Sequence, residues 1–407
     1  MLAAMLFRIA WRNVWRHTRR SVVTMAAMAL SLLTMVLYAG LIEGWMHSME
    51  GDVLDLEIGD VQVHAQGYLD DPSLWDVIED ADGVVARLRD QGIAASERLT
   101  TGGLGGHDDL SAGVLIRGVS VEGEPTISTL PGAIDRGAWL SADDPKGVVI
   151  GRRLARTLDA DVGDELILLT QDADGGMAND LFTVRGVLLG VGARVDGAGV
   201  LMSVESFRTF AALESGAHEI VARRSAGQSL DDLVAAVSAA APEADVQTWR
   251  QLMPIIATMI DAGRQMTGFI VFVVYLAIGI LMLNAMLMAV FERIRELGVM
   301  KALGMGPLQV FFVVVLEVAI QLGISGAIAG VLSVPAAWYM TVYGIQVGAL
   351  SGASFMGLAI DPAMKGHFTA EVVATPVILL IVIVGFACLF PAIRAARLHP
   401  VDAMRHR

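Results

Sequence analysis

Four long apolar runs constrain the fold of this chain more than any other feature of its sequence. They cover residues 22–42, 265–291, 308–343 and 372–393 and are nearly free of charged side chains. A helix needs about 20 apolar residues to cross a bilayer, so each run is long enough for one crossing. The runs raise the hydrophobic share of the chain to 55%, above the roughly 45–50% of soluble domains. The sequence therefore predicts an α-helical membrane protein with four transmembrane helices.

Residues 43–264, between the first two runs, have the composition of a globular domain. The alternating segment Ile58–Ala65 predicts a half-buried strand, and Val84–Arg89 and Leu230–Ala240 predict helices. The glycine-rich stretch Gly102–Gly106 is expected to form a flexible loop. The pattern predicts an α+β domain. Its 37 Asp and Glu against 16 Arg and Lys leave no large basic surface, which argues against nucleic-acid binding.

The distribution of basic residues predicts how the chain crosses the membrane. Segments 1–21, 292–307 and 394–407 contain nearly all the arginines and lysines outside the large domain, and the loop 344–371 has only Lys365. Basic short loops stay on the cytoplasmic side. Both termini and the 292–307 segment are therefore expected inside, with the large domain and the 344–371 loop outside.

The helices next to the runs carry further expectations. Trp249–Ala262 is amphipathic and continues into the second run, which predicts one continuous helix. The third run is too long for a straight crossing at about 1.5 Å per residue, so its helix either extends beyond the bilayer or is kinked at Pro335. The first run could also be a cleaved signal peptide, but its apolar core exceeds the roughly 7–15 residues of such peptides.

Segment 1–21 is predicted to be an interfacial elbow helix. Arg8, Arg12 and Arg16 recur every four residues and share one helical face, and Trp11 and Trp15 lie on others. Tryptophan and arginine are both favoured at the headgroup level of a membrane. We expect this helix to anchor the topology and to fix the angle of the first crossing.

The sequence gives no sign of catalytic, cofactor or metal chemistry. It contains no G-x-x-x-x-G-K-[ST] motif for nucleotide phosphates. The eight histidines lack metal-ligand spacing, and Cys388 is the single cysteine. We therefore expect a chain that is not an enzyme.

Segment 292–307 is the strongest candidate for a site. Charged residues gather at one end, and apolar side chains follow at helical spacing (Ile294, Leu297, Val299 or Met300, Leu303). A short helix cannot bury this apolar side alone, so we expect it to dock into a groove on a partner. The candidate residues for this contact are Glu292, Arg293, Arg295, Glu296, Leu297, Gly298, Lys301, Ala302, Leu303 and Gly304.

This segment resembles the coupling helix of the MacB/FtsX/LolC–LolE permease family, whose pattern is approximately R-x-x-E-[IL]-G-x-x-[KR]-A-[LI]-G. The match starts at Arg293 and ends at Gly304. The opening Ala10–Arg16, the run Gly147–Arg156 followed by Val162-Gly-Asp, and the tail Pro391–Met404 also resemble this family. The similarity covers essentially the whole chain in the order expected for these permeases.

The resemblance implies how such a chain works. It implies a protein of the bacterial inner membrane with a MacB-like periplasmic core domain. It also implies a dimer with a second permease copy or paralogue, bound to two copies of a separate ABC ATPase. ATP and Mg would be held by that partner, with no cofactor in this chain. ATPase dimerisation would move the crossing helices and the outer domains with them.

Two features inside the membrane leave alternatives open. Glu317 lies about ten residues into the third run, where an ionisable group is costly and usually faces other helices. It is either a coupling contact or, as we favour, a structural hydrogen-bonding residue. Methionines near the membrane surface can line an adaptable apolar cleft for acyl chains, although ordinary lipid-facing or core positions would also explain them. The candidate cargo cleft comprises Met46, Met49, Met259, Met266 and Phe269.

The family resemblance supports several functions. The start of the outer domain, Glu43–Met46 and then Gly59–Tyr68, is most similar to the LolE-like branch. Our leading hypothesis is therefore extraction of lipoproteins or another amphiphile from the outer leaflet, with membrane lipid as a further partner of the chain. The alternatives are a tripartite MacB-like exporter of peptides or drugs with a periplasmic adaptor, and an FtsX-like signalling module that activates a cell-wall hydrolase.

Overall fold

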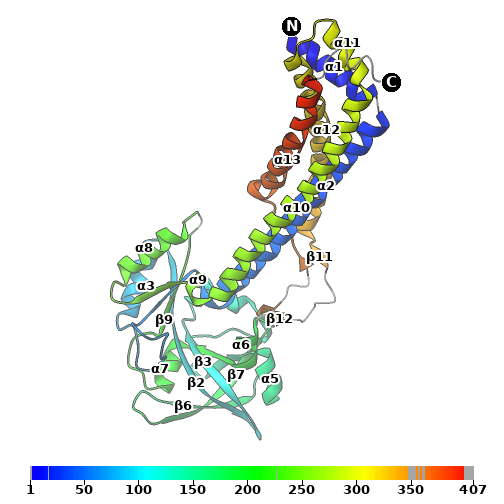
Figure 1. Cartoon of the computed structure of the whole chain (residues 1–407). Helices are drawn as coiled ribbons and strands as arrows, with labels where there is room; N and C mark the ends of the chain where they lie inside the picture. Colours follow the sequence, from blue (N-terminus) through cyan, green and yellow to red (C-terminus); the bar gives the residue numbers. More distant parts are fainter. Residues whose placement is uncertain are drawn as a thin grey trace. The chain divides into compact units, whose positions relative to one another are not determined.

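The computed structural model of the chain consists of two compact units. The helical unit comprises Met1–His47, Ile260–Val347 and Ala363–Arg407, and the α/β unit comprises Ser48–Met259 and Gly348–Pro362. The structure describes residues 2–16, 18–225, 227–346, 354–355, 358–359 and 363–397. Most of the predicted 394–407 tail and much of the predicted 344–371 loop lie outside these described residues. Each unit is described separately (Figure 1).

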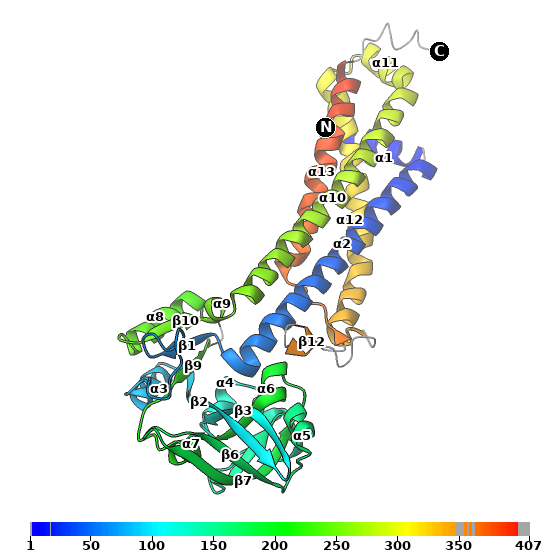
Figure 2. The same cartoon turned by 60° about the horizontal axis from the view of Figure 1, so that its bottom comes forward.

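Long helices running side by side dominate the helical unit, as both views show (Figures 1 and 2). Among the described residues, four helices are long and apolar enough to cross a membrane, judged by length and composition. Each contains one of the predicted runs, except that Tyr343, the last residue of the third run, follows the end of α12. Helix α12 continues through Pro335 and, with 36 residues, would be about 54 Å long, so it exceeds the roughly 30 Å hydrocarbon core. The helices are α1 (Leu2–Arg16), α2 (Thr18–Val53), α10 (Pro254–Glu292), α11 (Ile294–Ala302), α12 (Pro307–Val342) and α13 (Ala370–Arg397).

The helical unit is apolar both inside and outside. Its core gathers side chains from all six helices, for example Val14, Met28, Tyr275, Leu297 and Val384. Many large apolar side chains also face outward from α10, α12 and α13. A surface of this kind suits lipid rather than water, because hydrocarbon solvates apolar side chains while the helix satisfies its own backbone. Two short hairpins, β11 (Ile345–Gln346) with β14 (Ala363–Met364) and β12 (Ser354–Phe355) with β13 (Leu358–Ala359), follow α12 in the chain.

The α/β unit is built on one ten-stranded sheet, so the predicted mixture of strands and helices is confirmed. Nine strands follow the order β10-β1-β9-β2-β3-β8-β5-β7-β4, and β6 pairs with both β2 and β7. The strands are β1 (Val61–His64), β2 (Ala94–His107), β3 (Leu110–Val119), β4 (Ile134–Gly137), β5 (Gly147–Ile150), β6 (Glu165–Gln171), β7 (Met177–Leu188), β8 (Gly199–Ser203), β9 (Glu219–Arg223) and β10 (Asp245–Thr248). The helical elements are the π-helical turn η1 (Leu54–Ile58), the 3₁₀ turn η2 (Leu130–Gly132), α3 (Ala81–Asp90), α4 (Glu124–Ile127), α5 (Arg152–Leu158), α6 (Ala193–Ala198), α7 (Val204–Phe210), α8 (Leu230–Ala240) and α9 (Trp249–Leu252).

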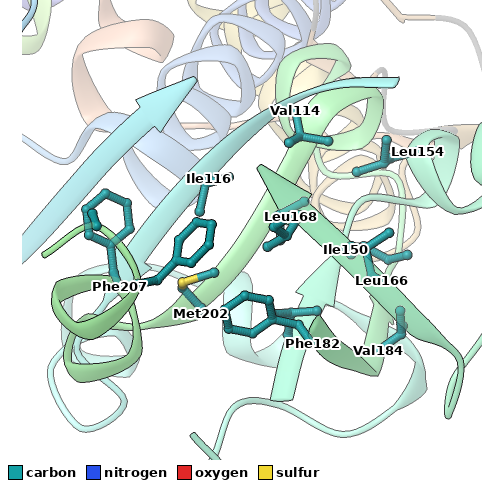
Figure 3. Close-up of a cluster of buried hydrophobic side chains, with 14 of the residues drawn as sticks. Val114, Ile116, Ile150, Leu154, Leu166, Leu168, Phe182, Val184, Met202 and Phe207 are labelled. Carbon is teal, nitrogen blue, oxygen red and sulfur yellow. The ribbon is translucent and has the colours of Figure 1, made fainter. Parts of the chain in front are cut away.

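The pairings close six of the strands into a ring. Strand β2 pairs with β3 and β6, β6 with β7, β7 with β5, β5 with β8, and β8 with β3. The ring encloses a core of apolar side chains that point toward one another (Figure 3), including Val114, Ile150, Leu168 and Phe182. A small ring filled by its own side chains is a packed core without a ligand channel.

A second core lies on the other part of the sheet. It joins Val61 and Val63 of β1 and Ile220 of β9 to the apolar faces of α3 and α8. The long strand β2 contributes to both cores, through Leu99 in the ring and Ala95 here. The α/β unit therefore has two apolar cores that share strand β2.

A buried ion pair joins the strands to α4. The guanidinium of Arg98 on β2 donates to Glu124 at 2.6 and 3.0 Å and to Glu219 of β9 at 3.0 Å. Burial alone would raise the pKa of the Glu124 carboxyl. The charge and hydrogen bonds of Arg98 have the larger effect, so the pKa of Glu124 is lowered. The same two carboxylates raise the pKa of Arg98 despite its burial. The pair is thus fixed in its charged form.

His218 is held as a neutral imidazole in the same region. Its Nδ1 accepts the backbone N–H of Thr100 at 2.8 Å, and its Nε2 lies 3.0 Å from the carbonyl oxygen of Leu74. This arrangement needs the proton on Nε2 and an empty Nδ1. Burial lowers the pKa of His218, although the Leu74 carbonyl acts in the opposite direction.

Two local expectations for the strands are corrected by the structure. The strand predicted at Ile58–Ala65 is buried on both faces, and its polar side chains are hydrogen-bonded inside the protein. Gln62 bonds to Glu219, His64 bonds to the carbonyl oxygen of His218, and the two side chains bond to each other. Gly102–Gly106 is part of strand β2, not a loop. A Cβ at Gly103 would clash with the carbonyl oxygen of Leu169, so glycine permits the close approach of β6.

The helix expected at Trp249–Ala262 is not continuous. Helix α9 ends at Leu252, Met253 adopts φ −123° and ψ 61°, and α10 begins at Pro254. Proline has no backbone N–H and a fixed φ, so it suits the first position of a new helix. The chain therefore has a joint here in place of the rigid rod that was expected.

Candidate coupling site at the turn between α10 and α12

Helix α11 is a nine-residue helix set between two long ones. Helix α10 ends at Glu292, Arg293 leaves the helical conformation at φ −106° and ψ 12°, and α11 then runs to Ala302. Gly304 closes the turn with φ +101°, a conformation that favours glycine. Pro307 starts α12 after Gly306. The sequence thus dictates a helical hairpin with a short helix at its tip.

The inner face of α11 packs on its own chain. Ile294 and Leu297 are buried, and Leu297 belongs to the core of the helical unit. Gly298 is also buried. We expected these apolar residues to be buried only by a partner protein. For this face the expectation is wrong, because neighbouring helices of the same unit already cover it.

A buried ion pair holds the α10–α11 joint to α12. The guanidinium of Arg293 lies 3.2 and 3.3 Å from the two carboxylate oxygens of Glu317 and donates to the carbonyl oxygen of Asn13 at 3.1 Å. The exposed fractions of the two charged side chains are 11% and 9%. One side chain therefore connects the joint to α1 and to α12. Glu317 faces the interior of the unit, in agreement with the expectation for a charged group in an apolar run.

Two more ion pairs link this turn to the N-terminal helices. Arg16 of α1 pairs with Glu296 at 3.0 Å, and Arg20 of α2 pairs with Glu292 at 3.1 Å. Both are partly exposed and individually weak. Together with Arg293, they tie both ends of the joint to the elbow and the first long helix.

Lys301 and the α13 end complete the internal contacts. The Lys301 ammonium donates to the carbonyl oxygen of Ala396 at 2.8 Å, near the last turn of α13. The guanidinium of Arg394 lies 4.8 Å from the ring centroid of Phe291. Four of the ten predicted partner-contacting residues, namely Glu292, Arg293, Glu296 and Lys301, thus bond within the chain.

The outer face of α11 is exposed and apolar. Val299 is 44% exposed, Leu303 is 83% exposed, and Leu308 at the start of α12 is 72% exposed. We call these three side chains the outer patch. Arg295, Ala302 and Gly304 are exposed beside it. Among the ten predicted residues, Arg295, Ala302, Leu303 and Gly304 are exposed without an ion pair given above, and Glu292 is exposed while paired with Arg20.

A cavity opens beside α11. It has a volume of about 440 Å³ and is lined by Asn13, Arg16, Arg293, Glu296 and Glu317, by Arg295 and Val299, and by other apolar side chains of α10, α11 and α12. The Arg293–Glu317 and Arg16–Glu296 pairs lie in its wall.

The elbow helix presents aromatic rings on its surface. Trp11 and Trp15 are exposed and interact edge to face at 6.0 Å between ring centroids, and Phe7 stacks on Trp11 at 6.3 Å. Arg8 and Arg12 are exposed beside them. Ala10 and Val14 are buried on the opposite side. The elbow therefore has a packed face and an aromatic and basic outer face.

The five residues of the predicted cargo cleft differ in their environments. Met46 is buried and lies against Gly263 of α10, whereas Met266 and Phe269 are exposed. These three residues of the helical unit therefore do not line one surface. In the α/β unit, Met49 is buried and Met259 is half-buried. The cargo cleft therefore remains a prediction, and the differing exposure of its residues gives it no support.

Sequence reasoning missed the partners of the joint. Asn13 contributes only a backbone carbonyl, which has no sequence signal. Arg20 was counted as a topology signal, yet it pairs with Glu292 across 272 positions of sequence. The available signal was that Glu292 follows the second run and Arg20 precedes the first, so both would lie at the same membrane surface.

The long apolar helices, the ion-paired turn and the separate α/β unit define a polytopic membrane protein with a large extramembrane domain. The family model of the MacB-like periplasmic core domain matches residues 21–240, more than half of the chain. The model of the FtsX-like permease C-terminal region matches residues 268–400. The chain belongs to the MacB/FtsX family of ABC transporter permease components, which work with ABC ATPase partners.

Solved structures of two family-related domains are similar to part of the chain. The periplasmic region of MacB from Actinobacillus actinomycetemcomitans has 13% identity and a TM-score of 0.36, covering 48% of this chain and 91% of that one. The extracellular domain of the noncanonic ABC-type transporter YknZ from Gram-positive bacteria has 11% identity and a TM-score of 0.34, covering 46% and 99%. A search of curated protein sequences returned no match.

Proposed function

We propose that this chain is the permease subunit of an ABC transporter of the mechanotransmission type, driven by a separate ATPase that docks on the outer patch of α11. The outer patch carries this proposal. Leu303 and Val299 project from a short helix whose other face is fixed to the chain by ion pairs. Exposed apolar side chains on such a helix favour burial in a partner groove.

The contacts suggest a route for force. A displacement of α11 acts on Arg293, and through it on Glu317 of α12 and on Asn13 of α1. Arg16 and Arg20 extend the connection to α1 and α2. Helices α2 and α10 lead into and out of Ser48–Met259, the larger part of the α/β unit. Motion at the turn would thus reach that part of the unit through these helices.

The proposed topology follows the charges. The basic elbow, the α11 turn and the α13 end would face the cytoplasm, and the α/β unit would lie in the periplasm. The proposed assembly is a permease dimer in the bacterial inner membrane with two ATPase copies. ATP and Mg would bind to those copies.

We propose lipoproteins or another outer-leaflet amphiphile as the cargo. The resemblance of Glu43–Met46 and Gly59–Tyr68 to the LolE-like branch supports this choice. Exposing acyl chains to water costs about 0.8 kcal/mol per CH₂, so lifting them needs both ATP energy and apolar protein surface.

The test is purification of the complex from its native membrane in mild detergent. Co-purification of an ABC ATPase with the native chain, and its loss with Leu303→Asp, would support the docking site. Leu110→Asp, the same change at an exposed position of β3 in the α/β unit, is the matched control and should retain the ATPase. Mass spectrometry of the complex would then identify lipoprotein, adaptor or hydrolase partners, and the absence of any lipoprotein would count against the proposed cargo.

A further inference from the structure

A second cavity of the helical unit lies at the opposite ends of its helices. It has a volume of about 540 Å³ and is lined only by residues of α2, α10 and the start of α13 with the segment just before it. Its polar wall contains Glu43, His47, Arg264, His367 and Glu371. Its apolar wall contains Ala39, Ile42, Val271, Val372 and Pro376. A cavity of this size with a few convergent polar groups is typical of a small-ligand site.

Helix geometry places this cavity at headgroup depth. The 23 residues from Arg20 to Glu43 on α2, and the 23 from Glu371 to Arg394 on α13, each span about 34 Å. The 28 residues from Arg264 to Glu292 on α10 span about 42 Å. These lengths match the roughly 30 Å hydrocarbon core and the 40–45 Å or so that includes the headgroups. If the α11 turn lies at one surface, the cavity lies among the headgroups of the other leaflet.

The walls of the cavity are joined by specific contacts. Arg264 of α10 donates to Glu43 of α2 at 3.0 Å. The backbone N–H of His367 donates to the carbonyl oxygen of Gly40 at 2.8 Å, and the His47 and His367 rings stack at 4.6 Å between centroids. A Cβ at Gly44 would clash with the carbonyl oxygen of Lys365, so glycine lets this segment lie directly on α2. The cavity is therefore a built feature of the helical unit.

The polar side chains that line the cavity include both acidic and basic groups. Several of them can accept hydrogen bonds from a ligand. The guanidinium of Arg264 and the imidazoles can meet a phosphate. The hydroxyls of Thr267 and Thr375 donate to the carbonyl oxygens of Gly263 and Glu371, so their oxygens face a ligand as acceptors. With the carboxylate of Glu371, these acceptors suit a ligand that donates several N–H bonds.

We propose that this cavity binds the headgroup of a zwitterionic phospholipid with a primary ammonium group, of the phosphoethanolamine type. The phosphate would lie at Arg264 and the stacked imidazoles, and the ammonium at Glu371 and Thr375. The glycerol and first methylenes would lie along Ile42, Val271 and Val372. A choline headgroup carries the same charge but has no N–H to donate, so the cavity discriminates against it. The inference rests on the membrane-spanning role of these helices and does not depend on the cargo.

The experiment is native mass spectrometry of the purified, delipidated full chain titrated with phosphatidylethanolamine, phosphatidylcholine or phosphatidylglycerol of identical acyl chains. We expect the ethanolamine lipid to bind about tenfold or more tightly than the others, the effect of one charge-assisted hydrogen bond. Glu371→Gln should remove the preference and Glu371→Asp should retain most of it. Glu243→Gln, an identical change at an exposed position of the α/β unit, should have no effect.

Two results would overturn the proposal. One is that the native chain and Glu371→Gln each bind the three lipids with equal affinity, while both proteins are monodisperse and helical. The other is displacement of the ethanolamine lipid by a triacylated lipopeptide that binds Glu371→Gln as tightly as the native chain, because such a ligand lacks the phosphate and ammonium. Neither readout involves ATPase binding or cargo release, so failure here and failure of the proposed function are distinguishable.

Discussion

Replacing Glu317 by glutamine tests whether the Arg293–Glu317 pair holds the turn of the helical hairpin. The substitution keeps the shape of the side chain but removes the charge next to a guanidinium that is 11% exposed. Removing one partner of a buried pair costs about 3–5 kcal/mol, because the other charge is left uncompensated. Arg293 keeps its bond to Asn13, so we expect the lower end, about 3 kcal/mol.

The reciprocal change, Arg293→Gln, should behave differently with pH. A guanidinium cannot lose its proton, whereas an isolated buried carboxyl can take one up. Where it does so, the folded variant binds more protons than the unfolded chain, and its stability rises as the pH falls. The cost of Glu317→Gln should stay constant as the pH falls.

The assay is denaturant unfolding of the purified chain in mild detergent, followed by tryptophan fluorescence, for the native protein, both single variants and the double variant. We expect a coupling energy of about 2 kcal/mol or more from the cycle. Arg16→Gln is the control, because its pair with Glu296 is 61% and 42% exposed and should be worth less than about 1 kcal/mol. Additive single effects within about 0.5 kcal/mol, or a cost of Arg293→Gln that is independent of pH, would refute the reasoning.

Other predictions concern the outer patch and the α/β unit. Val299→Asp should weaken ATPase binding about tenfold or more in a pull-down while leaving the unfolding transition of the permease unchanged, since its side chain is already 44% exposed. Glu124→Gln should destabilise the α/β unit by about 3 kcal/mol, measured by hydrogen exchange of the β2 and β9 amides in the full chain. Because the pKa of Glu124 is lowered in the fold, its contribution should be present above about pH 4.3 and be lost as the pH falls through the folded value. Because the pKa of His218 is lowered below 6.5, acidification below about pH 6.5 should reduce protection of the Thr100 amide, and His218→Asn should show no such change with pH.

The long helices could be predicted from the sequence because their signal is local. Apart from Tyr343, each apolar run lies inside one long helix, and a chain of about 20 apolar residues has few other structures in which its backbone is satisfied. Two helices of the α/β unit were predicted for the same reason, since Val84–Arg89 and Leu230–Ala240 show the helical period directly. Composition was misleading at Gly102–Gly106, where glycine serves close strand packing.

The candidate site was predicted in position but not in its contacts. The family pattern in 293–304 located the turn, and its apolar spacing predicted a short helix. The sequence could not show that one face of α11 is already covered by its own chain. It also could not show that Glu296 and Lys301 bond to Arg16 and Ala396.

The sequence by itself determined where the long helices lie, which segments are apolar enough for lipid, and which permease family the chain resembles. Only the tertiary structure decided which charges are buried together, as in Arg293 with Glu317 and Arg98 with Glu124. It alone also assembled a polar cavity from three helices. The physical reason is range: helix formation and lipid solubility depend on neighbours within a few residues, whereas ion pairing depends on which distant segments come within about 3 Å of each other.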